Sequence, residues 1–278
     1  MAVQAHVKLI ALDLDGTSVQ PSGAIGPRLL KAVTDAQDRG VRVLLATGRM
    51  VQSARRYWLE LKLNPGPLIA YNGGQAVTMP DESVIFRHGL SSQAAHFVIQ
   101  KALEYDILAQ VYIGDEMWIS REDSRARHYI ESNHIPAWVR SGTDIFDWPE
   151  APIKILLQAD SAVLDQFRPV IEEPASALNY RVFKSQQDYL EIVQHGVGKG
   201  PALQEVCQRL GIVSSEVMAI GDAENDSDML HWCGFGVAMG QAPASVKRLA
   251  RFVTAPIEED GAAIAIEKWV LEAPSLKA

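Results

Sequence analysis

The chain has 278 residues, of which 47% are hydrophobic and 22% charged, and its formal net charge is -8. This composition is that of a globular protein with room for one large domain or two moderate ones, and the negative charge disfavours nucleic acid or an anionic membrane as partner. No apolar run approaches the roughly 18 residues that cross a bilayer, and the N-terminal stretch lacks the order of segments of a signal peptide, so we expect a cytoplasmic protein.

The first 83 residues alternate between strand-like and helix-like patterns. Apolar runs predict three strands, at 7–13, 41–47 and 67–74. From Ile25 to Arg39 the apolar residues recur at helical spacing, and a second helix is expected after residue 49. Strands separated by helices of this length are typical of a parallel sheet with helices on both faces.

From about residue 84 the predicted strands lie closer together. The pattern predicts a hairpin, a strand, a helix and a second pair of strands, at 107–120, 154–160, 161–173 and 180–193. This segment is therefore expected to form an antiparallel sheet with helices on one face. The stretch 134–153 is the least regular part of the chain, and its role stays open.

After Gly196 the first rhythm returns. The pattern predicts a helix near 199–211, a strand at 216–222, a helix after it, a strand at 234–240 and a closing helix that contains 263–270. We therefore predict an α/β fold with a Rossmann-like core of parallel strands. The core is discontinuous, formed by 1–83 and 195–278, and an α+β domain is inserted at 84–194.

Polar clusters follow four of the predicted strands. In chain order they are Asp13-x-Asp15-Gly-Thr, Thr47-Gly48-Arg49, Asn72-Gly73-Gly74 and Gly221-Asp222-x-x-Asn225-Asp226. In open α/β sheets, ligands bind beyond the carboxyl ends of the strands. Four such clusters in one chain predict a site at that edge of the sheet.

The pair Asp13 and Asp15 indicates phosphoryl transfer. A carboxylate can attack a phosphoryl group, and a second carboxylate two residues on, on the same face of a strand, can protonate the leaving alcohol and then activate water. Several carboxylates would repel a phosphate dianion, so Mg²⁺, which prefers oxygen ligands, is expected, with Asp222 as a further ligand. Lys199 and Thr47 could balance the phosphoryl charge.

Each of these residues also has a purely structural interpretation. Asp13 and Asp15 could cap a turn, and Thr47 is an ordinary helix N-cap residue. Asn72 suits a turn, Asp226 suits the first turn of a helix, and an isolated lysine such as Lys199 is usually a surface residue.

The order of four motifs carries a family resemblance. In chain order they are LIALDLDGT, LLATGR, GVGKGPAL and MAIGDAENDSDML. The chain resembles the haloacid dehalogenase superfamily of phosphatases, in particular the Cof-type branch (subfamily IIB), whose large inserted cap is of the C2B type. The resemblance spans almost all of the core, whereas the cap agrees in placement and strand order.

The resemblance implies a role for each site residue. Asp13 would be the nucleophile and Asp15 the general acid/base, and Mg²⁺ would be held by Asp13, the main-chain carbonyl of Asp15 and Asp222, with Asp226 near its water shell. The phosphoryl oxygens would be bound by Thr47 and Lys199, with Asn225 beside them. The mouth of the site under the cap would be lined by Gly48, Arg49, Asn72 and Gly73.

The chain also departs from the family pattern. Ser18 and Val19 follow the first motif where an apolar pair is usual, and Gln241 replaces a usual asparagine. Within the lysine motif, Gly198 precedes Lys199 where Ser is common, and Pro201 follows Gly200 where Thr or Ala is common. None of these changes removes a group that performs chemistry.

The resulting prediction is a Mg²⁺-dependent phosphatase of small phosphorylated metabolites, with sugar phosphates favoured by family analogy. A phosphomutase on the same scaffold and a non-catalytic protein that binds phosphometabolites stay open, whereas a dinucleotide-binding oxidoreductase is disfavoured because no GxGxxG follows the first strand. The oligomeric state is not set by the sequence. Candidates for reading the substrate from the cap are Trp118, Trp138, Arg140 and Lys154.

Overall fold

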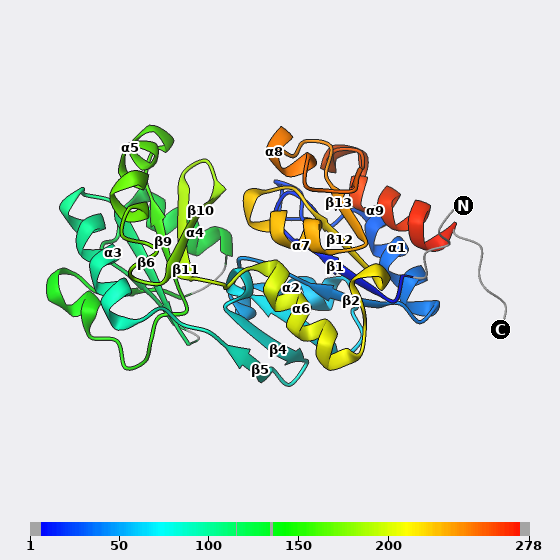
Figure 1. Cartoon of the computed structure of the whole chain (residues 1–278), viewed down its shortest axis with the longest axis horizontal. Coiled ribbons are helices and arrows are strands. Elements are labelled where there is room, and N and C mark those ends of the chain that lie inside the picture. The colour runs from blue at the N-terminus through cyan, green and yellow to red at the C-terminus, as the bar shows by residue number, and fades with distance from the viewer. Residues whose placement is uncertain (1–6, 115, 134–135, 273–278) are drawn as a thin grey trace.

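The protein folds into two lobes, one around a five-stranded sheet and one around a six-stranded sheet, and a smaller sheet is formed by three further strands (Figure 1). The structure, a computed structural model, describes residues 7–114, 116–133 and 136–272. Across these residues, no helix is both long enough and apolar enough to pass through a membrane.

The first lobe contains a five-stranded parallel sheet. Its strands, in spatial order, are β14 (Phe252–Val253), β13 (Phe235–Ala238), β12 (Val217–Gly221), β1 (Leu9–Leu12) and β2 (Arg42–Leu45). Its helices are α1 (Pro27–Asp38), α2 (Val51–Glu60), α6 (Lys199–Leu210), α7 (Ser227–Trp232), α8 (Ala244–Lys247) and α9 (Gly261–Ile266). The short helical turns of the chain are η1 (Tyr71–Gly73), η2 (Gly142–Phe146), η3 (Ser214–Glu216), η4 (Glu224–Asp226), η5 (Ile257–Glu259) and η6 (Glu267–Leu271).

Alternating side chains of β1 enter two different hydrophobic clusters. Ile10 and Leu12 pack with α1, α2 and α9, whereas Leu9 and Ala11 pack with α6 and α7. Because side chains alternate between the two faces of a strand, the side chains of β1 point to both faces of the sheet. Both sets are apolar because helices cover both faces. The predicted parallel sheet with two helical layers is confirmed.

The third predicted strand behaves differently from the prediction. β3 (Gly66–Ala70) is joined to the chain just beyond β2 by one parallel bridge, Ala46 to Ile69, and pairs antiparallel with β4 (Gln75–Met79), which pairs with β5 (Ser83–Arg87). The expectation that β3 is an ordinary member of the parallel sheet was wrong. The chain turns back at η1 instead of crossing over through a helix.

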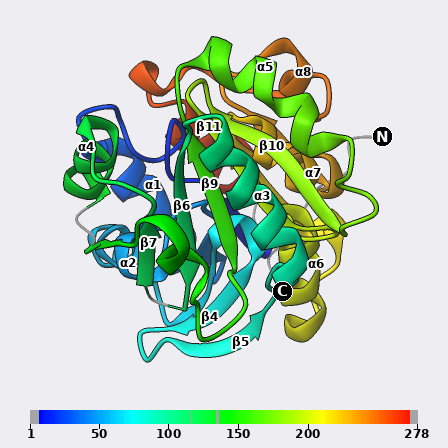
Figure 2. The ribbon, with the colours of Figure 1, turned by 90° about the vertical axis from the view of Figure 1, so that its left-hand side faces the viewer.

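The second lobe is a six-stranded, mainly antiparallel sheet. Its strands, in spatial order, are β10 (Tyr180–Gln186), β11 (Tyr189–Gln194), β9 (Lys154–Gln158), β6 (Leu108–Ile113), β7 (Glu116–Ile119) and β8 (Trp138–Val139). The helices α3 (Ser92–Glu104) and α5 (Ser161–Glu172) pack on one face through a second hydrophobic core. Figure 2 looks onto this lobe, with α3 crossing in front of the strands.

The helix α4 (Ser124–Asn133) departs from the expected one-sided arrangement. Ala126 and Tyr129 of α4 pack with Tyr112 and Leu156, which lie on the opposite face of the sheet from the α3 side. That face is turned toward the first lobe. Of the irregular stretch predicted at 134–153, residues 134–135 lie outside the described residues, and the rest contains β8 and η2.

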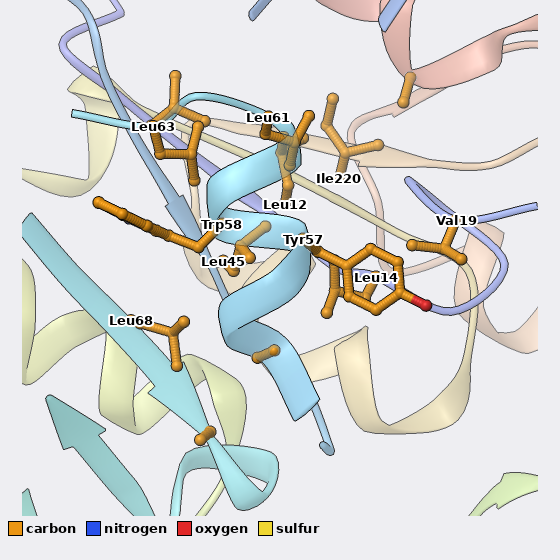
Figure 3. Packing of buried hydrophobic residues seen from close by; sticks show 14 of the residues in the cluster. Leu12, Leu14, Val19, Leu45, Tyr57, Trp58, Leu61, Leu63, Leu68 and Ile220 are labelled. Atoms are coloured by element: carbon orange, nitrogen blue, oxygen red, sulfur yellow. The ribbon is translucent and has the colours of Figure 1, made fainter. Parts of the chain in front are cut away.

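Helix α2 is fixed to the first sheet by large apolar side chains (Figure 3). Tyr57 and Trp58 are 1% and 8% exposed. They share a cluster with Leu12, Leu14, Leu45, Leu63, Leu68 and Ile220. Burying one side chain of this size contributes about 1.5–3 kcal/mol. This packing holds the turn before α2, where the Thr47-Gly48-Arg49 cluster lies.

Candidate active site

The predicted polar clusters converge at the carboxyl edge of the parallel sheet. In register, Leu12 of β1 lies opposite Ile220 of β12 and Leu45 of β2. The residues that follow these strands therefore come side by side, and they include Asp13, Asp222 and Thr47. The turn after β3 joins them, because the backbone N–H of Asn72 donates to the carbonyl of Thr47 at 3.0 Å.

Lys199 is buried between two carboxylates. Its Nζ lies 2.5 Å from Oδ1 of Asp13 and 2.6 Å from Oδ1 of Asp226, and all three side chains are almost fully buried. Although burial alone lowers the pKa of Lys199, Asp13 and Asp226 together raise it above its usual value. Lys199 is therefore a fixed positive charge beside Asp13.

Three carboxylates meet at this point. Ligand oxygens of Asp13, Asp222 and Asp226 all lie within 4.8 Å of one another. Burial, and then repulsion from Asp226, raises the pKa of Asp13 despite its pairing with Lys199, and the same causes raise the pKa of Asp222 to about 7. Lys199 balances one charge of this group, so when all three carboxylates are ionised two negative charges are left for a cation to balance. Clustered carboxylate oxygens suit a hard divalent cation.

Two of the three carboxylates have further hydrogen bonds. Thr17 Oγ1 donates to Oδ1 of Asp222 at 3.0 Å. Oδ2 of Asp226 accepts from the backbone N–H groups of Asp222 and Ala223, at 2.9 and 3.0 Å. Asp226 is thus occupied by Lys199 on one side and by its own loop on the other, which leaves Asp13 and Asp222 as the better placed ligands.

Asp15 lies outside the three-carboxylate cluster and is paired with Arg49. The guanidinium donates from Nε to Oδ2 at 2.9 Å and from the second terminal nitrogen to Oδ1 at 2.6 Å. Arg49 also donates to Ser53 Oγ at 3.2 Å. The Asp15 side chain remains 41% exposed. A two-pronged pair of this kind fixes the direction of both side chains.

The turn after β3 has an unusual backbone. Tyr71, Asn72 and Gly73 have φ angles of 53°, 55° and 92° in succession. Residues other than glycine adopt this left-handed backbone conformation only at an energetic cost, so contacts with neighbouring residues must stabilise the turn. Tyr71 N–H donates to the carbonyl of Arg49 at 3.0 Å, which locks the turn to the one before α2. A Cβ on Gly73 would lie 2.1 Å from the carbonyl oxygen of Gly198.

A cavity of about 200 Å³ lies between the lobes, with Asp13, Asp15, Gly48, Arg49 and Asn225 on its first-lobe side. On the second-lobe side it is lined by His128, Tyr129, Ser132, Lys154, Tyr189 and Glu191. Asn72 and Gly73, predicted at the mouth, are buried and are not among the residues that line this cavity. Of the substrate-reading candidates, Lys154 lines the cavity, whereas Trp118, Trp138 and Arg140 do not.

Several residues of the cavity were missed by the sequence reasoning. Glu191 is 3% exposed, although it stands in the otherwise apolar strand YLEIV. A charged residue inside an apolar strand was a usable signal, because a buried charge is costly unless it is paired. His128 and Ser132, on an exposed helix pattern, carried no such signal.

Two departures from the family pattern make contacts at the site. Ser18 Oγ donates to the carbonyl oxygen of Asp13 at 2.6 Å. Gln241 Nε2 donates to the carbonyl oxygen of Gly16 at 2.5 Å, and its Oε1 accepts from the N–H of Ile257 at 3.2 Å. Both side chains brace the loop that carries Asp13 and Asp15.

A basic side chain among carboxylates, at the carboxyl edge of a parallel sheet and under a second lobe, is the arrangement of an α/β phosphoryl-transfer enzyme. Residues 10–266 match the haloacid dehalogenase-like hydrolase family. The chain is 30% identical over 281 residues to the 5-amino-6-(5-phospho-D-ribitylamino)uracil phosphatase YcsE of Bacillus subtilis, across 98% of this chain and 100% of that protein.

Two further similarities agree with this match. The HMP-PP phosphatase of Cronobacter sakazakii is 30% identical over 237 residues, across 84% of this chain and 85% of that protein. A solved structure of a haloacid dehalogenase subclass IIB sugar phosphatase has the same fold, with a TM-score of 0.83 at 21% identity over 95% of this chain and 99% of that one.

The chain belongs to the haloacid dehalogenase-like hydrolase family and is a phosphatase. The resemblance, the fold class and the enzyme class that the sequence predicted are confirmed.

Proposed function

We propose that this phosphatase is Mg²⁺-dependent and hydrolyses small phosphorylated metabolites, sugar phosphates among them, through an aspartyl-phosphate on Asp13 with Asp15 as general acid/base. The observation that carries the proposal is the setting of Asp13. It is buried at the end of β1, with Lys199 Nζ 2.5 Å from one oxygen and with Asp222 and Asp226 around it. A carboxylate in this position can act as the nucleophile that attacks phosphorus opposite the leaving oxygen.

The chemistry needs two steps. Asp13 attacks phosphorus, the bond to the leaving oxygen breaks, and Asp15 donates a proton to that oxygen. Water then attacks the aspartyl-phosphate, Asp15 takes the proton, and inorganic phosphate leaves with Asp13 restored. To reach the leaving oxygen, the Asp15 carboxylate must part from Arg49, whose guanidinium then becomes available to the substrate.

Asp13 and Asp222, with the main-chain carbonyl of Asp15, would hold Mg²⁺, and Asp226 would stand behind them near its water shell. When bound, the ion neutralises the charge of the phosphoryl oxygens. The charge left over by three carboxylates and one ammonium supports this assignment.

We assign the remaining site residues to phosphoryl and substrate binding. Lys199 and Thr47 would bind the phosphoryl oxygens, and Asn225 would lie beside them. Arg49 and Gly48 line the cavity and would meet the leaving group, while Asn72 and Gly73 lie buried in the turn after β3.

We also propose that 84–194 is the inserted cap that selects the substrate, and that 1–83 and 195–278 form the catalytic core. The names of two relatives support a phosphorylated small molecule as substrate, one of them a phosphorylated ribitylaminouracil. The net charge of -8 favours such a partner over nucleic acid or a membrane surface, and we place the protein in the cytoplasm.

The test is phosphate release from p-nitrophenyl phosphate and from a panel of sugar phosphates, a phosphorylated ribitylaminouracil and HMP-PP, with Mg²⁺ and with EDTA. Release that requires Mg²⁺ and is lost in Asp13→Asn supports the proposal. Release that persists in EDTA, or in Asp13→Asn, contradicts it.

The two alternatives give different products. A phosphomutase would convert a sugar phosphate into its isomer without net inorganic phosphate, which product analysis on the same panel detects. A non-catalytic binding protein would bind a panel member without changing it. The intact set of Asp13, Asp15, Lys199 and Asp222 disfavours this last possibility, because a protein that only binds could lose any of these residues.

A further inference from the structure

The second lobe places a buried ion pair against the first lobe. Lys154 Nζ lies 2.8 Å from Oε2 of Glu191, and the two side chains are 1% and 4% exposed. Lys154 comes from β9 and Glu191 from β11, where Glu191 lies opposite Leu156. Residues two apart share a face of a strand, so both charges lie on the Leu156 face, which is turned toward the first lobe.

Lys154 reaches across to the turn before α2. Its Nζ donates to the carbonyl oxygen of Gly48 at 2.8 Å and lies 4.5 Å from the ring centroid of Tyr112. Gly48 stands between Thr47 and Arg49, which we assign to substrate binding. A cap lysine thus holds the backbone of a core turn.

Glu191 reaches across to the turn after β3. Asn72 Nδ2 donates to its Oε2 at 2.7 Å, and Asn225 Nδ2 donates in turn to Oδ1 of Asn72 at 2.8 Å. A carboxylate only accepts hydrogen bonds, so Glu191 sets the direction of both amides. Asn225 Oδ1 is left buried without a hydrogen-bond partner among the described residues, and Asn225 lines the cavity.

A buried charge is costly unless it is paired, so cap strands do not gain stability from this pair alone. Its partners explain the arrangement better: between them, Lys154 and Glu191 contact the turn before α2, the turn after β3 and, through Asn72, the loop that carries Asp222 and Asp226.

We propose that Lys154 and Glu191 are positioning residues that couple the seating of the cap to the geometry of the phosphoryl site. When the cap is seated, one pair fixes three core loops together; when it opens, water replaces those contacts. This inference rests on the proposed function, because it assumes that these loops hold the phosphoryl group.

The test compares Lys154→Met, Glu191→Leu and the double variant with the wild type, using p-nitrophenyl phosphate turnover and hydrogen exchange. The matched control is Arg168→Met, because Arg168 of α5 also pairs across the lobes, with Glu224 at 3.7 Å, but at the surface. p-Nitrophenyl phosphate is small, so a loss of cap contacts to a leaving group contributes little to the result.

We expect kcat to fall at least about tenfold in the charge variants while KM changes less than about threefold, because misplaced reacting groups slow the chemical step. Amide exchange should accelerate at 47–49 and 71–74, and not in the control. The double variant leaves no unpaired buried charge, so it should fold even where a single variant does not.

A folded double variant with the kcat and the exchange pattern of the wild type would overturn the inference. A wild type that releases no phosphate from any substrate would instead count against the proposed function. The exchange measurement requires no turnover, so it decides the coupling of cap and loops in that case as well.

Discussion

At the scale of single residues, the site depends on one lysine. Lys199 is in contact with two buried carboxylates, and it joins the end of β1 to the loop after β12. Breaking a buried ion pair by removing one partner leaves an uncompensated charge, which costs more than the pair itself contributes.

We therefore expect Lys199→Met to lower the free energy of unfolding by about 3–5 kcal/mol and to abolish turnover. Urea unfolding followed by circular dichroism measures the loss. Lys31→Met is the control, because Lys31 pairs with Asp35 on an exposed helix face and should change little. Equal midpoints for the two variants would contradict the role given to Lys199.

The residue types of the site could be predicted because each follows an apolar strand in a recognisable motif. The pairings could not. Arg49 and Asp15 are 34 positions apart, and their contact depends on β1 and β2 being neighbours in a particular register. The sequence reasoning placed both at one edge of the sheet but contained no information on which side chains would pair.

At the scale of elements, the turn η1 and the start of α6 pack backbone against backbone. Gly73 combines a φ of 92° with a Cβ position 2.1 Å from the carbonyl oxygen of Gly198. Gly198 directly precedes Lys199, so a shift here would move the lysine away from Asp13.

Gly73→Ala is therefore expected to be far more damaging than Gly211→Ala. Gly211 has a φ of 66° but nothing within 4 Å of its Cβ position, so its substitution has only the backbone cost of about 1–2 kcal/mol. Thermal unfolding and turnover of both variants separate the clash from the conformational cost. Similar losses in the two variants would refute the close approach.

The predicted helices and strands agree closely with the observed ones where the local sequence pattern determines the secondary structure. The predicted helix at 199–211 is α6 (Lys199–Leu210), and the pair of strands at 180–193 is β10 and β11. The prediction was wrong where the arrangement depends on which other element a strand or helix packs against. The sequence of β3 does not indicate that β4 is its pairing partner. The helix α4 has few apolar residues, so its sequence does not indicate which face of the sheet it covers.

At the scale of the whole molecule, the site lies between two lobes and is held by charges from both. The fold class could be predicted because the alternation of elements and the motifs agree along the chain. The ion pair on the cap face that is turned toward the first lobe could not be predicted. Lys154 and Glu191 are 37 positions apart and meet only when β9 and β11 pair.

Metal binding should stabilise the whole protein. A ligand that binds only the native state raises stability by mass action, about 2.7 kcal/mol at a hundredfold excess over its Kd. We expect Mg²⁺ to raise the Tm, EDTA to reverse the shift, and Asp222→Asn to remove most of it. If the Tm of the wild type does not change when Mg²⁺ is added, the proposal that a cation binds among these carboxylates is contradicted.

The central claim is that phosphate passes through Asp13. Mixing enzyme with substrate, quenching in acid within one turnover and mapping peptides by mass spectrometry tests it directly. We predict one phosphoryl group on the peptide that contains Asp13 and none in Asp13→Asn. Steady phosphate release by an enzyme that never carries a phosphoryl group on Asp13 would mean that water attacks the substrate directly, and would contradict the claim.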